Sequence, residues 1–156
     1  MDDQIQLNKV HIRWMIRRDM PEVLQIEQSS FEYPWLEKDF IRRLRQRNCI
    51  GNVAELGEKI VGFMVYELQK PKLHIINFAV HAEHRRCGIG TSMAEKLVKN
   101  LHIPYRTEIY LEIRETNLNS QLFFRSVSFR ATRVLHKFYN DTDEDAFMMV
   151  YRLKKS

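Results

Sequence analysis

The sequence predicts an α/β (α+β) domain in which a mixed central sheet of about seven strands is flanked by about four helices. Runs in which apolar and polar residues alternate, as in strands, are interleaved with runs in which apolar residues recur at helical spacing. The expected order is strand, two helices, three strands, helix, strand, helix and two strands. This interleaving favours a mixed sheet with helices on its faces.

The composition is that of a globular protein. The chain has 156 residues, 44% of them hydrophobic, which suits a single domain over residues 1–156. No apolar run approaches the roughly 20 residues of a membrane span, and no signal-peptide pattern opens the chain. Cys49 and Cys87 are too few for a disulfide scaffold and lack metal-ligand spacing. We therefore expect a cytoplasmic protein with reduced thiols, no metal site and no membrane contact.

The charge balance is basic. The formal net charge is +5 and the pI is about 9.3, which favours an anionic partner such as a phosphorylated cofactor, or residence near nucleic acid. The arginines of residues 42–47 are interpreted as a solvated helix face, with a basic surface near RNA as the alternative. Because no RNA-binding motif is recognised, specific nucleic-acid binding is not expected.

The first third of the chain predicts a strand and two helices. Residues 10–16 alternate as in a strand. Asp19 is the expected N-cap of the first helix, with Pro21 in its first turn. Residues 29–34 interrupt the helical pattern, and a second helix is expected over residues 36–47.

The middle of the chain predicts three strands and a helix. Residues 49–56 and 59–68 are expected to form a hairpin that turns at Gly57. The apolar residues 73–80 predict a buried strand, and a helix is expected over residues 91–102. Its apolar stripe consists of Met93, Ala94, Leu97, Val98 and Leu101.

The last third predicts a strand, a short helix and two strands, over residues 108–114, 117–127, 129–138 and 146–153. Alternation in the first of these places Glu112 between Tyr110 and Arg114, on the face opposite the apolar residues. Thr116 or Asn117 would cap the short helix. An acidic turn, residues 140–145, joins the two final strands.

An anion site is expected between the buried strand and the following helix. Glycines allow a tight turn whose backbone N–H groups approach a ligand, and a helix N-terminus attracts negative charge. Arginine side chains add charge-assisted hydrogen bonds. The residues of this turn, called the cradle below, are Arg85, Arg86, Gly88, Ile89, Gly90 and Thr91.

The cradle resembles the Q/R-x-x-G-x-G/A signature with which GNAT acetyltransferases bind the pyrophosphate of acetyl-CoA. The element order is also that of the family, and the resemblance covers roughly residues 10–153. Residues 31–37, FEYPWLE, resemble the F-P-W-x-E loop of the RimI-type enzymes, which acetylate protein N-termini. Residues 111–114 with Asn117 resemble their L-E-V-R…N segment, and residues 136–139 with the acidic turn resemble their N-Y-Y…E-D-A end.

This resemblance implies an acyltransferase that uses acetyl-CoA and works by direct attack of an amine on the thioester. The implied acceptor is a protein or peptide N-terminus, with a ribosomal protein as one candidate. Two alternatives stay open: a GNAT enzyme acting on lysine side chains or a small amine, and an acyl-CoA-binding module with weak catalysis. A monomer or a homodimer is expected.

By resemblance, Glu112 is the catalytic base, and partial burial in its strand would raise its pKa. The alternative is a structural glutamate paired with a basic residue such as Arg114. His74 is a second catalytic candidate, with a hydrogen-bonded structural histidine as the alternative. The family's general-acid tyrosine is replaced by Phe124, so a water or another hydroxyl, such as that of Tyr139 or Tyr110, would substitute.

The resemblance also implies the ligand-binding segments. Acetyl-CoA would contact the cradle, the amide of Asn117, Phe124 and the backbone of Phe78, Ala79 and Val80. Asn117 has helix capping as its alternative role. The acceptor would contact Tyr33, Pro34, Trp35, Phe138 and Tyr139. For Tyr33 and Trp35, anchoring of their loop in the core is the alternative.

Overall fold

The computed structural model describes residues 10–154 and contains the expected mixed sheet of seven strands, four α-helices and two 3-10 helices within that range. The strands are β1 (Val10–Trp14), β2 (Cys49–Leu56), β3 (Lys59–Leu68), β4 (Lys72–Val80), β5 (Glu108–Arg114), β6 (Arg130–Leu135) and β7 (Ala146–Arg152). The α-helices are α2 (Met20–Ser30), α3 (Glu37–Leu44), α4 (Ile89–Val98) and α5 (Leu118–Ser126). The 3-10 helices are η1 (Arg17–Asp19) and η2 (Ala82–His84). The predicted fold class is confirmed.

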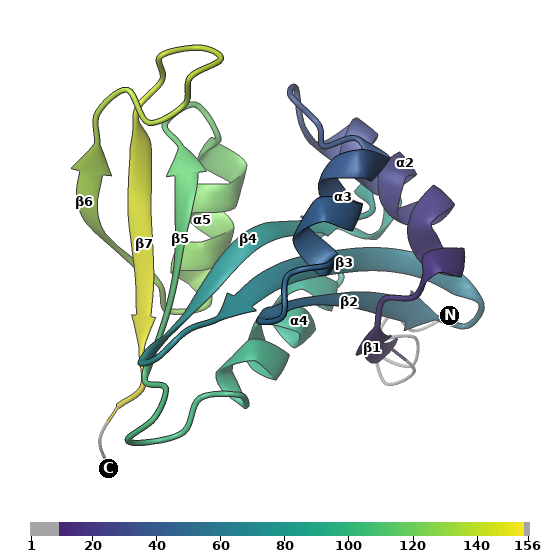
Figure 1. Ribbon diagram of the computed structural model, residues 1–156, viewed down its shortest axis with the longest axis horizontal. Coiled ribbons are helices and arrows are strands. Elements are labelled where there is room, and N and C mark those ends of the chain that lie inside the picture. Colours follow the sequence, from purple (N-terminus) through teal and green to yellow (C-terminus); the bar gives the residue numbers. More distant parts are fainter. Residues whose placement is uncertain (1–9, 155–156) are drawn as a thin grey trace. The chain divides into compact units, whose positions relative to one another are not determined.

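The strand order is β1-β2-β3-β4-β5-β7-β6. Strands β4 and β5 run parallel, and the pairs β1–β2, β2–β3, β5–β7 and β6–β7 are antiparallel. The chain divides into two compact units (Figure 1). The first holds the described residues up to Leu68 together with Ile75–Lys96, and the second holds Gln69–His74 and the described residues from Leu97 onward.

In the first unit, successive residues of β3 face helices on opposite sides of the sheet. Phe63 contacts Phe40 of α3 edge to face, with ring centroids 5.5 Å apart. A Cβ built on the preceding Gly62 would lie 2.9 Å from Sδ of Met93, on α4. Because neighbouring side chains of a strand point to opposite faces, α3 and α4 cover opposite faces of this part of the sheet. Figure 1 shows this arrangement, with α2 beside α3.

The first helix begins as predicted but lasts longer. Pro21 lies in the first turn of α2, and the helix continues to Ser30, so the expected interruption from residue 29 is wrong. Asp19 occupies the N-cap position without a side-chain cap bond. Its carboxylate instead accepts two hydrogen bonds from Arg13, both 2.8 Å long, and a third from the N–H of Ile16. The predicted capping role of its side chain is therefore wrong, because the arginine and the preceding turn engage the carboxylate.

Other element ends also differ from the expectation. Helix α3 spans Glu37–Leu44 rather than residues 36–47, and α4 spans Ile89–Val98 rather than residues 91–102. After α4 the N–H of Leu101 donates to the carbonyl of Val98, a tighter turn than an α-helical one. Leu101 is buried all the same. The apolar stripe therefore predicted burial correctly beyond the point where the helix ends.

In the second unit, the two faces of β5 have different roles. Ile109, Leu111 and Ile113 are buried, and Tyr110, Glu112 and Arg114 alternate with them. Helix α5 lies on the apolar side (Figure 1), where Phe129 packs between Phe124 of α5 and Tyr151 of β7. Tyr151 pairs in register with Ile109 and so shares its face. The other face of β5 thus carries a row of polar side chains.

Strand β6 is the edge strand of this unit. All its residues except Leu135 are exposed, including Arg130 and Arg133. The register with β7 shifts between Ala131 and Arg133, which marks a β-bulge. Among the described residues, no helix is both long and apolar enough to cross a membrane.

Candidate active site

The polar face of β5 brings two of the catalytic candidates, His74 and Glu112, together. Nε2 of His74, on β4, lies 2.7 Å from Oε2 of Glu112. Their side chains are 21% and 16% exposed, so the pair is partly shielded from water and still reachable. The parallel pairing of β4 with β5 explains the contact, because His74 is in register with Tyr110, two residues before Glu112 on the same face.

The His74 ring is held on its flat side by Tyr110. The two rings stack with centroids 4.3 Å apart and an interplanar angle of 3°. The Tyr110 hydroxyl donates to Oε1 of Gln69 at 3.1 Å, and Nζ of Lys72 lies 5.6 Å from the centre of the Tyr110 ring. Tyr110 therefore orients the imidazole, and its hydroxyl is already engaged in a hydrogen bond.

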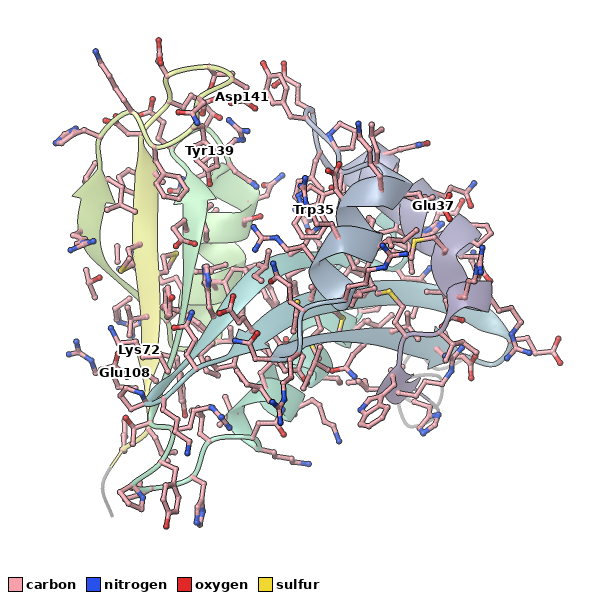
Figure 2. All side chains as sticks on the ribbon, viewed as in Figure 1. Trp35, Glu37, Lys72, Glu108, Tyr139 and Asp141 are labelled. Carbon is pink, nitrogen blue, oxygen red and sulfur yellow. The ribbon has the colours of Figure 1, made fainter. Side chains whose placement is uncertain are left out.

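The next residue of the row, Arg114, holds the loop between β6 and β7. Tyr139 and Asp141 lie on this loop (Figure 2). The guanidinium carbon of Arg114 lies 3.9 Å from the centre of the Tyr139 ring. Arg114 donates to Asp141 at 2.7 Å and to Thr142 at 3.2 Å. Nη1 also lies 3.5 Å from Oε1 of Glu144. These contacts fix the turn between β6 and β7.

The same surroundings change the acidity of Tyr139. Burial raises the pKa of Tyr139 to about 12, against the opposing influence of the Arg114 charge, and the Glu112 carboxylate contributes to the increase. Its phenol therefore stays protonated at neutral pH and can donate a hydrogen bond. A thiol of roughly cysteine-like pKa, about 8.5, is much more acidic than this phenol, so Tyr139 is suited to stabilise a thiolate rather than to protonate it fully.

Helix α5 carries Phe124 and begins at Asn117. Phe124 is 3% exposed and contacts Phe129 edge to face, with ring centroids 5.1 Å apart. Asn117 is the N-cap, and its amide oxygen accepts from the N–H of Ser120 at 3.2 Å. The capping role is therefore real, and any role toward acetyl-CoA falls to its amide nitrogen.

In the first unit, the cradle has the backbone that an anion site requires. Gly88 has a φ of 83° and Arg86 has a φ of 63°, both in the left-handed region. The N–H of Ser92 donates to the carbonyl of Gly88, which starts α4. The N–H groups of residues 89–91 precede this first helical hydrogen bond and have no partner within the helix. They are the donors that a pyrophosphate would use.

Arg85 holds the cradle to its surroundings. Its Nε donates to the carbonyl of Val80, at the end of β4, and its Nη2 donates to Oγ of Ser30, at the end of α2, both at 3.1 Å. Arg85 and the neighbouring Arg86 are both exposed, but only Arg85 forms these hydrogen bonds. The two arginines thus differ: the Arg85 side chain braces the turn, and the Arg86 side chain is available to an anion.

Close packing brings α4 against the sheet. A Cβ on Gly62 would lie 3.2 Å from the carbonyl oxygen of Ala79, as well as 2.9 Å from Met93. Within the cradle, Ile89 and Gly90 are buried. The cradle is therefore supported from below at the end of β4, which carries Phe78, Ala79 and Val80. These residues fit a cofactor with a pyrophosphate group.

The predicted acceptor residues are partly engaged in packing. The Trp35 ring contacts Phe40 edge to face, with centroids 5.0 Å apart, and belongs to the periphery of the core. Tyr33 is 45% exposed, and Pro34 is half-buried. In the second unit, Phe138 is 44% exposed and packs edge to face on Tyr139. Trp35 therefore anchors its loop, and Tyr33 and Phe138 present accessible rings.

A hydrogen-bonded carboxylate and imidazole can remove a proton from an incoming ammonium, and a glycine-rich turn at a helix start can hold a phosphorylated cofactor. The GNAT acetyltransferase family model matches residues 20–129. The chain belongs to the GNAT acetyltransferase family. This GNAT protein is accordingly an N-acetyltransferase that uses acetyl-CoA.

Relatives of this GNAT protein include enzymes that modify protein N-termini. The ribosomal protein bS18-alanine N-acetyltransferase of Escherichia coli K12 is 27% identical over 133 residues, which cover 84% of this chain and 89% of that protein. An N-alpha-acetyltransferase of Sulfolobus acidocaldarius is 27% identical over 151 residues, which cover 88% and 89%.

Solved structures share the fold. The crystal structure of the ribosomal-protein-S18-alanine N-acetyltransferase from E. coli superposes with a TM-score of 0.81, at 23% identity, over 94% of this chain and 96% of that one. Arabidopsis thaliana NAA60, crystallised with acetyl-CoA, has a TM-score of 0.80 at 19% identity, over 92% and 99%.

Two buried polar residues of the GNAT domain, Glu27 and Asn77, had no predicted role. Glu27 lies one residue after Ile26 and four after Val23, on the buried stripe of α2. A charged residue on an apolar helix stripe is the signal that could have identified it. No group of three or more metal-ligating side chains that could hold a metal ion is present among residues 10–154.

Proposed function

We propose that this protein transfers the acetyl group of acetyl-CoA to the N-terminal α-amine of a protein, with a ribosomal protein as a candidate acceptor. The observation that carries the proposal is the contact of Glu112 with His74, a base and its partner at 2.7 Å. The acceptor class is supported by the E. coli and S. acidocaldarius relatives, which align with 84% and 88% of this chain.

In the proposed reaction, the Glu112–His74 pair accepts the proton that the acceptor ammonium must lose before its nitrogen can attack. One hydrogen bond joins the carboxylate to the imidazole, so each side chain orients the other. When bound, acetyl-CoA supplies an activated thioester, whose carbon–sulfur bond breaks as the carbon–nitrogen bond forms. The Tyr139 hydroxyl is proposed to donate a hydrogen bond to the sulfur that carries away the electron pair. The second proton, which the nitrogen loses on forming the amide, passes to this sulfur through solvent.

The cofactor is proposed to lie along the end of β4 and in the cradle. The backbone of Phe78, Ala79 and Val80 would orient its arm, and Arg86 with the N–H groups at the start of α4 would hold its pyrophosphate. The amide nitrogen of Asn117 and the ring of Phe124 are kept as proposed contacts. The acceptor N-terminus is proposed to meet Tyr33, Pro34, Trp35, Phe138 and Tyr139.

Three broader features belong to the same proposal. Both compact units would form one acetyltransferase domain over residues 1–156. The family match supports this, because the matched residues 20–129 include parts of both units. The protein would act in the cytoplasm, where acetyl-CoA is at hand and Cys49 and Cys87 stay as free thiols. A monomer or a homodimer would be active without nucleic acid.

The test is a panel of peptides that differ only in the first residue, with Ala, Ser, Met and Gly among them, each carrying one internal lysine. Each peptide is incubated with acetyl-CoA and the modified atom is located by fragmentation mass spectrometry. We expect the acetyl group on the α-amine, with Ala at the first position among the preferred substrates.

Matched peptides with a blocked α-amine serve as the control and should gain no acetyl group. Acetylation of the lysine alone, equal in blocked and unblocked peptides, would replace the N-terminal assignment with a lysine or small-amine acceptor. Binding of acetyl-CoA without transfer to any amine would favour the acyl-CoA-binding module.

A further inference from the structure

A buried carboxylate links two parts of the first unit. Glu27 is 1% exposed. Its Oε2 accepts from the backbone N–H of Trp35 at 2.9 Å, and its Oε1 accepts from Nδ2 of Asn77 at 2.7 Å. Burial raises the pKa of Glu27, and these two hydrogen bonds oppose that increase. A buried charge is costly unless it is hydrogen-bonded, and here each carboxylate oxygen has a hydrogen-bond donor.

The orientation of Asn77 follows from its second contact. Its Oδ1 accepts from the backbone N–H of Phe78 at 2.8 Å. Because the amide oxygen faces that N–H, the amide nitrogen must face Glu27. The two groups that form hydrogen bonds with Glu27, the Trp35 N–H and the Asn77 amide nitrogen, are therefore both donors. An ionised carboxylate, which only accepts, matches them on both oxygens, and an amide at position 27 does not.

The two ends of this chain of hydrogen bonds are ligand-binding segments in the proposed function. Trp35 belongs to residues 31–36, called the acceptor loop here. Phe78 begins the part of β4 proposed to orient the arm of acetyl-CoA. A second link from the end of α2 reaches the same region, because Arg85 joins Ser30 to the carbonyl of Val80.

We propose that Glu27 is a positioning residue that, together with Asn77, couples the acceptor loop to the cofactor-binding end of β4. Coenzyme A bound along β4 restrains Phe78 and Asn77, and Glu27 passes this restraint to the backbone of Trp35. Coupling of this kind is reciprocal, so a bound cofactor tightens acceptor binding and a bound acceptor tightens cofactor binding. The inference rests on the proposed function for the identity of the loop's ligand.

The coupling can be measured without catalysis, because Trp35 itself reports on the loop. The chain has two tryptophans, and Trp14 is 77% exposed, so a Trp14→Phe background leaves Trp35 as the single tryptophan. Quenching of its fluorescence by acrylamide is measured with and without coenzyme A. We expect coenzyme A to lower the quenching constant in this background and to leave it unchanged after Glu27→Gln.

The decisive variant restores the hydrogen bonds with the groups exchanged. In Glu27→Gln alone, one donor stays unpaired: the N–H of Trp35, or that of Phe78 if the Asn77 amide turns over. Adding Asn77→Asp completes the pattern, because Gln at position 27 accepts from Trp35 and donates to Asp at position 77, which accepts from Phe78. We expect the double variant to regain the response of Trp35 to coenzyme A.

A structural control is available on the same helix. Oε2 of Glu22 accepts from the backbone N–H of Ile60 at 3.0 Å, outside the ligand-binding segments. Glu22→Ala removes this acceptor, so it should lower the melting temperature and keep the response of Trp35. A purely structural role of Glu27 would give the same result for Glu27→Gln, which would overturn the inference.

Acceptor affinity gives a second measure. For the wild type, we expect coenzyme A to lower the Kd of an accepted peptide about fivefold or more, the size typical of coupled sites, and Glu27→Gln to bring this ratio close to one. If Glu27→Gln does not fold, the double variant is the test: a response of Trp35 to coenzyme A in it supports the inference, and its absence overturns the inference. Failure of the peptide panel would disprove the acceptor class, whereas an unchanged response of Trp35 would disprove the coupling alone.

Discussion

Arg114 and Tyr139 form a cation–π contact, with the guanidinium carbon 3.9 Å from the centre of the ring. The same guanidinium donates to both carboxylate oxygens of Asp141, at 3.2 and 2.7 Å. Because a flat guanidinium can stack on a ring and donate in its own plane at once, one side chain fixes both residues of the turn. The position of the Tyr139 hydroxyl therefore depends on an arginine of the neighbouring strand.

Arg114→Lys should disorder this turn, because an ammonium keeps the charge and loses the stacked, two-pronged geometry. We expect kcat/KM for the acceptor to fall about tenfold, the equivalent of one charge-assisted hydrogen bond, with little change in the Kd of coenzyme A. Arg152→Lys is the control, because Arg152 is 71% exposed and pairs with Glu108 on the same strand pair. Equal kinetics in the two variants would remove Arg114 from the positioning of Tyr139.

Glu112→Gln should lower kcat by about 10²- to 10⁴-fold, the usual contribution of a positioned base. His74→Gln should lower it similarly, and the double variant should be no worse than the more damaged single one, because partners that act as a unit are not additive. Steady-state kinetics check the rates, and calorimetric titration with coenzyme A checks that binding is kept. Glu115→Gln, at an exposed residue just after β5, is the control. If the fold-losses in kcat of the two single variants multiply in the double variant, the two residues act separately.

The raised pKa of Tyr139 should be visible in an ultraviolet titration. The titration curves of the wild type and of Tyr139→Phe should differ by the absorbance of one phenolate. This difference should develop near pH 12 rather than near 10, the ordinary pKa of tyrosine. The folded state favours the protonated phenol, so this contribution to stability is full below pH 10 and is lost between pH 10 and about 12. The free energy of unfolding should accordingly fall less over that range in Tyr139→Phe. If the wild type and Tyr139→Phe already differ in phenolate absorbance at pH 10, the assignment of the raised pKa to Tyr139 is contradicted.

Gly62→Ala should weaken cofactor binding from beneath the cradle. The added methyl group would lie 3.2 Å from the carbonyl oxygen of Ala79, which cannot rotate away, and 2.9 Å from Sδ of Met93. We expect the Kd of coenzyme A to rise about tenfold, because overpacking costs of order 1–3 kcal/mol and shifts α4 with its N-terminus. Gly57→Asn is the control: Gly57 has a φ of 64°, which Asn tolerates, and nothing lies within 4 Å of its Cβ position.

Local patterns predicted much of the fold. The hairpin strands β2 and β3 and the strand β5 have the expected bounds, because alternation and a glycine turn act over a few neighbouring residues. Helix ends were less predictable. Helix α4 begins at Ile89, inside the cradle, and ends at Val98, although the apolar stripe continues to Leu101. The stripe reports which residues are buried, whereas the end of a helix depends on backbone hydrogen bonds.

The contacts of the candidate site depend on register, which the sequence does not show. The resemblance pointed to Glu112 and His74 separately, but 38 residues separate them, and only the pairing of β4 with β5 brings their side chains together. The link from Glu27 to Asn77 spans 50 residues and joins a helix to a strand. The family resemblance indicated the segments, and the hydrogen bonds between segments required the structure.

The bulged edge of β6 has a consequence for the proposed function, in which the acceptor is a peptide chain. Such peptides readily add to a regular sheet edge, and a captured chain would be held by its backbone whatever its first residue. The shifted register between Ala131 and Arg133 and the exposed Arg130 and Arg133 make this edge a poor template. This edge is therefore poorly suited to hold an extended polypeptide as an added strand, and in the proposed function discrimination is left to the groups that meet the chain terminus.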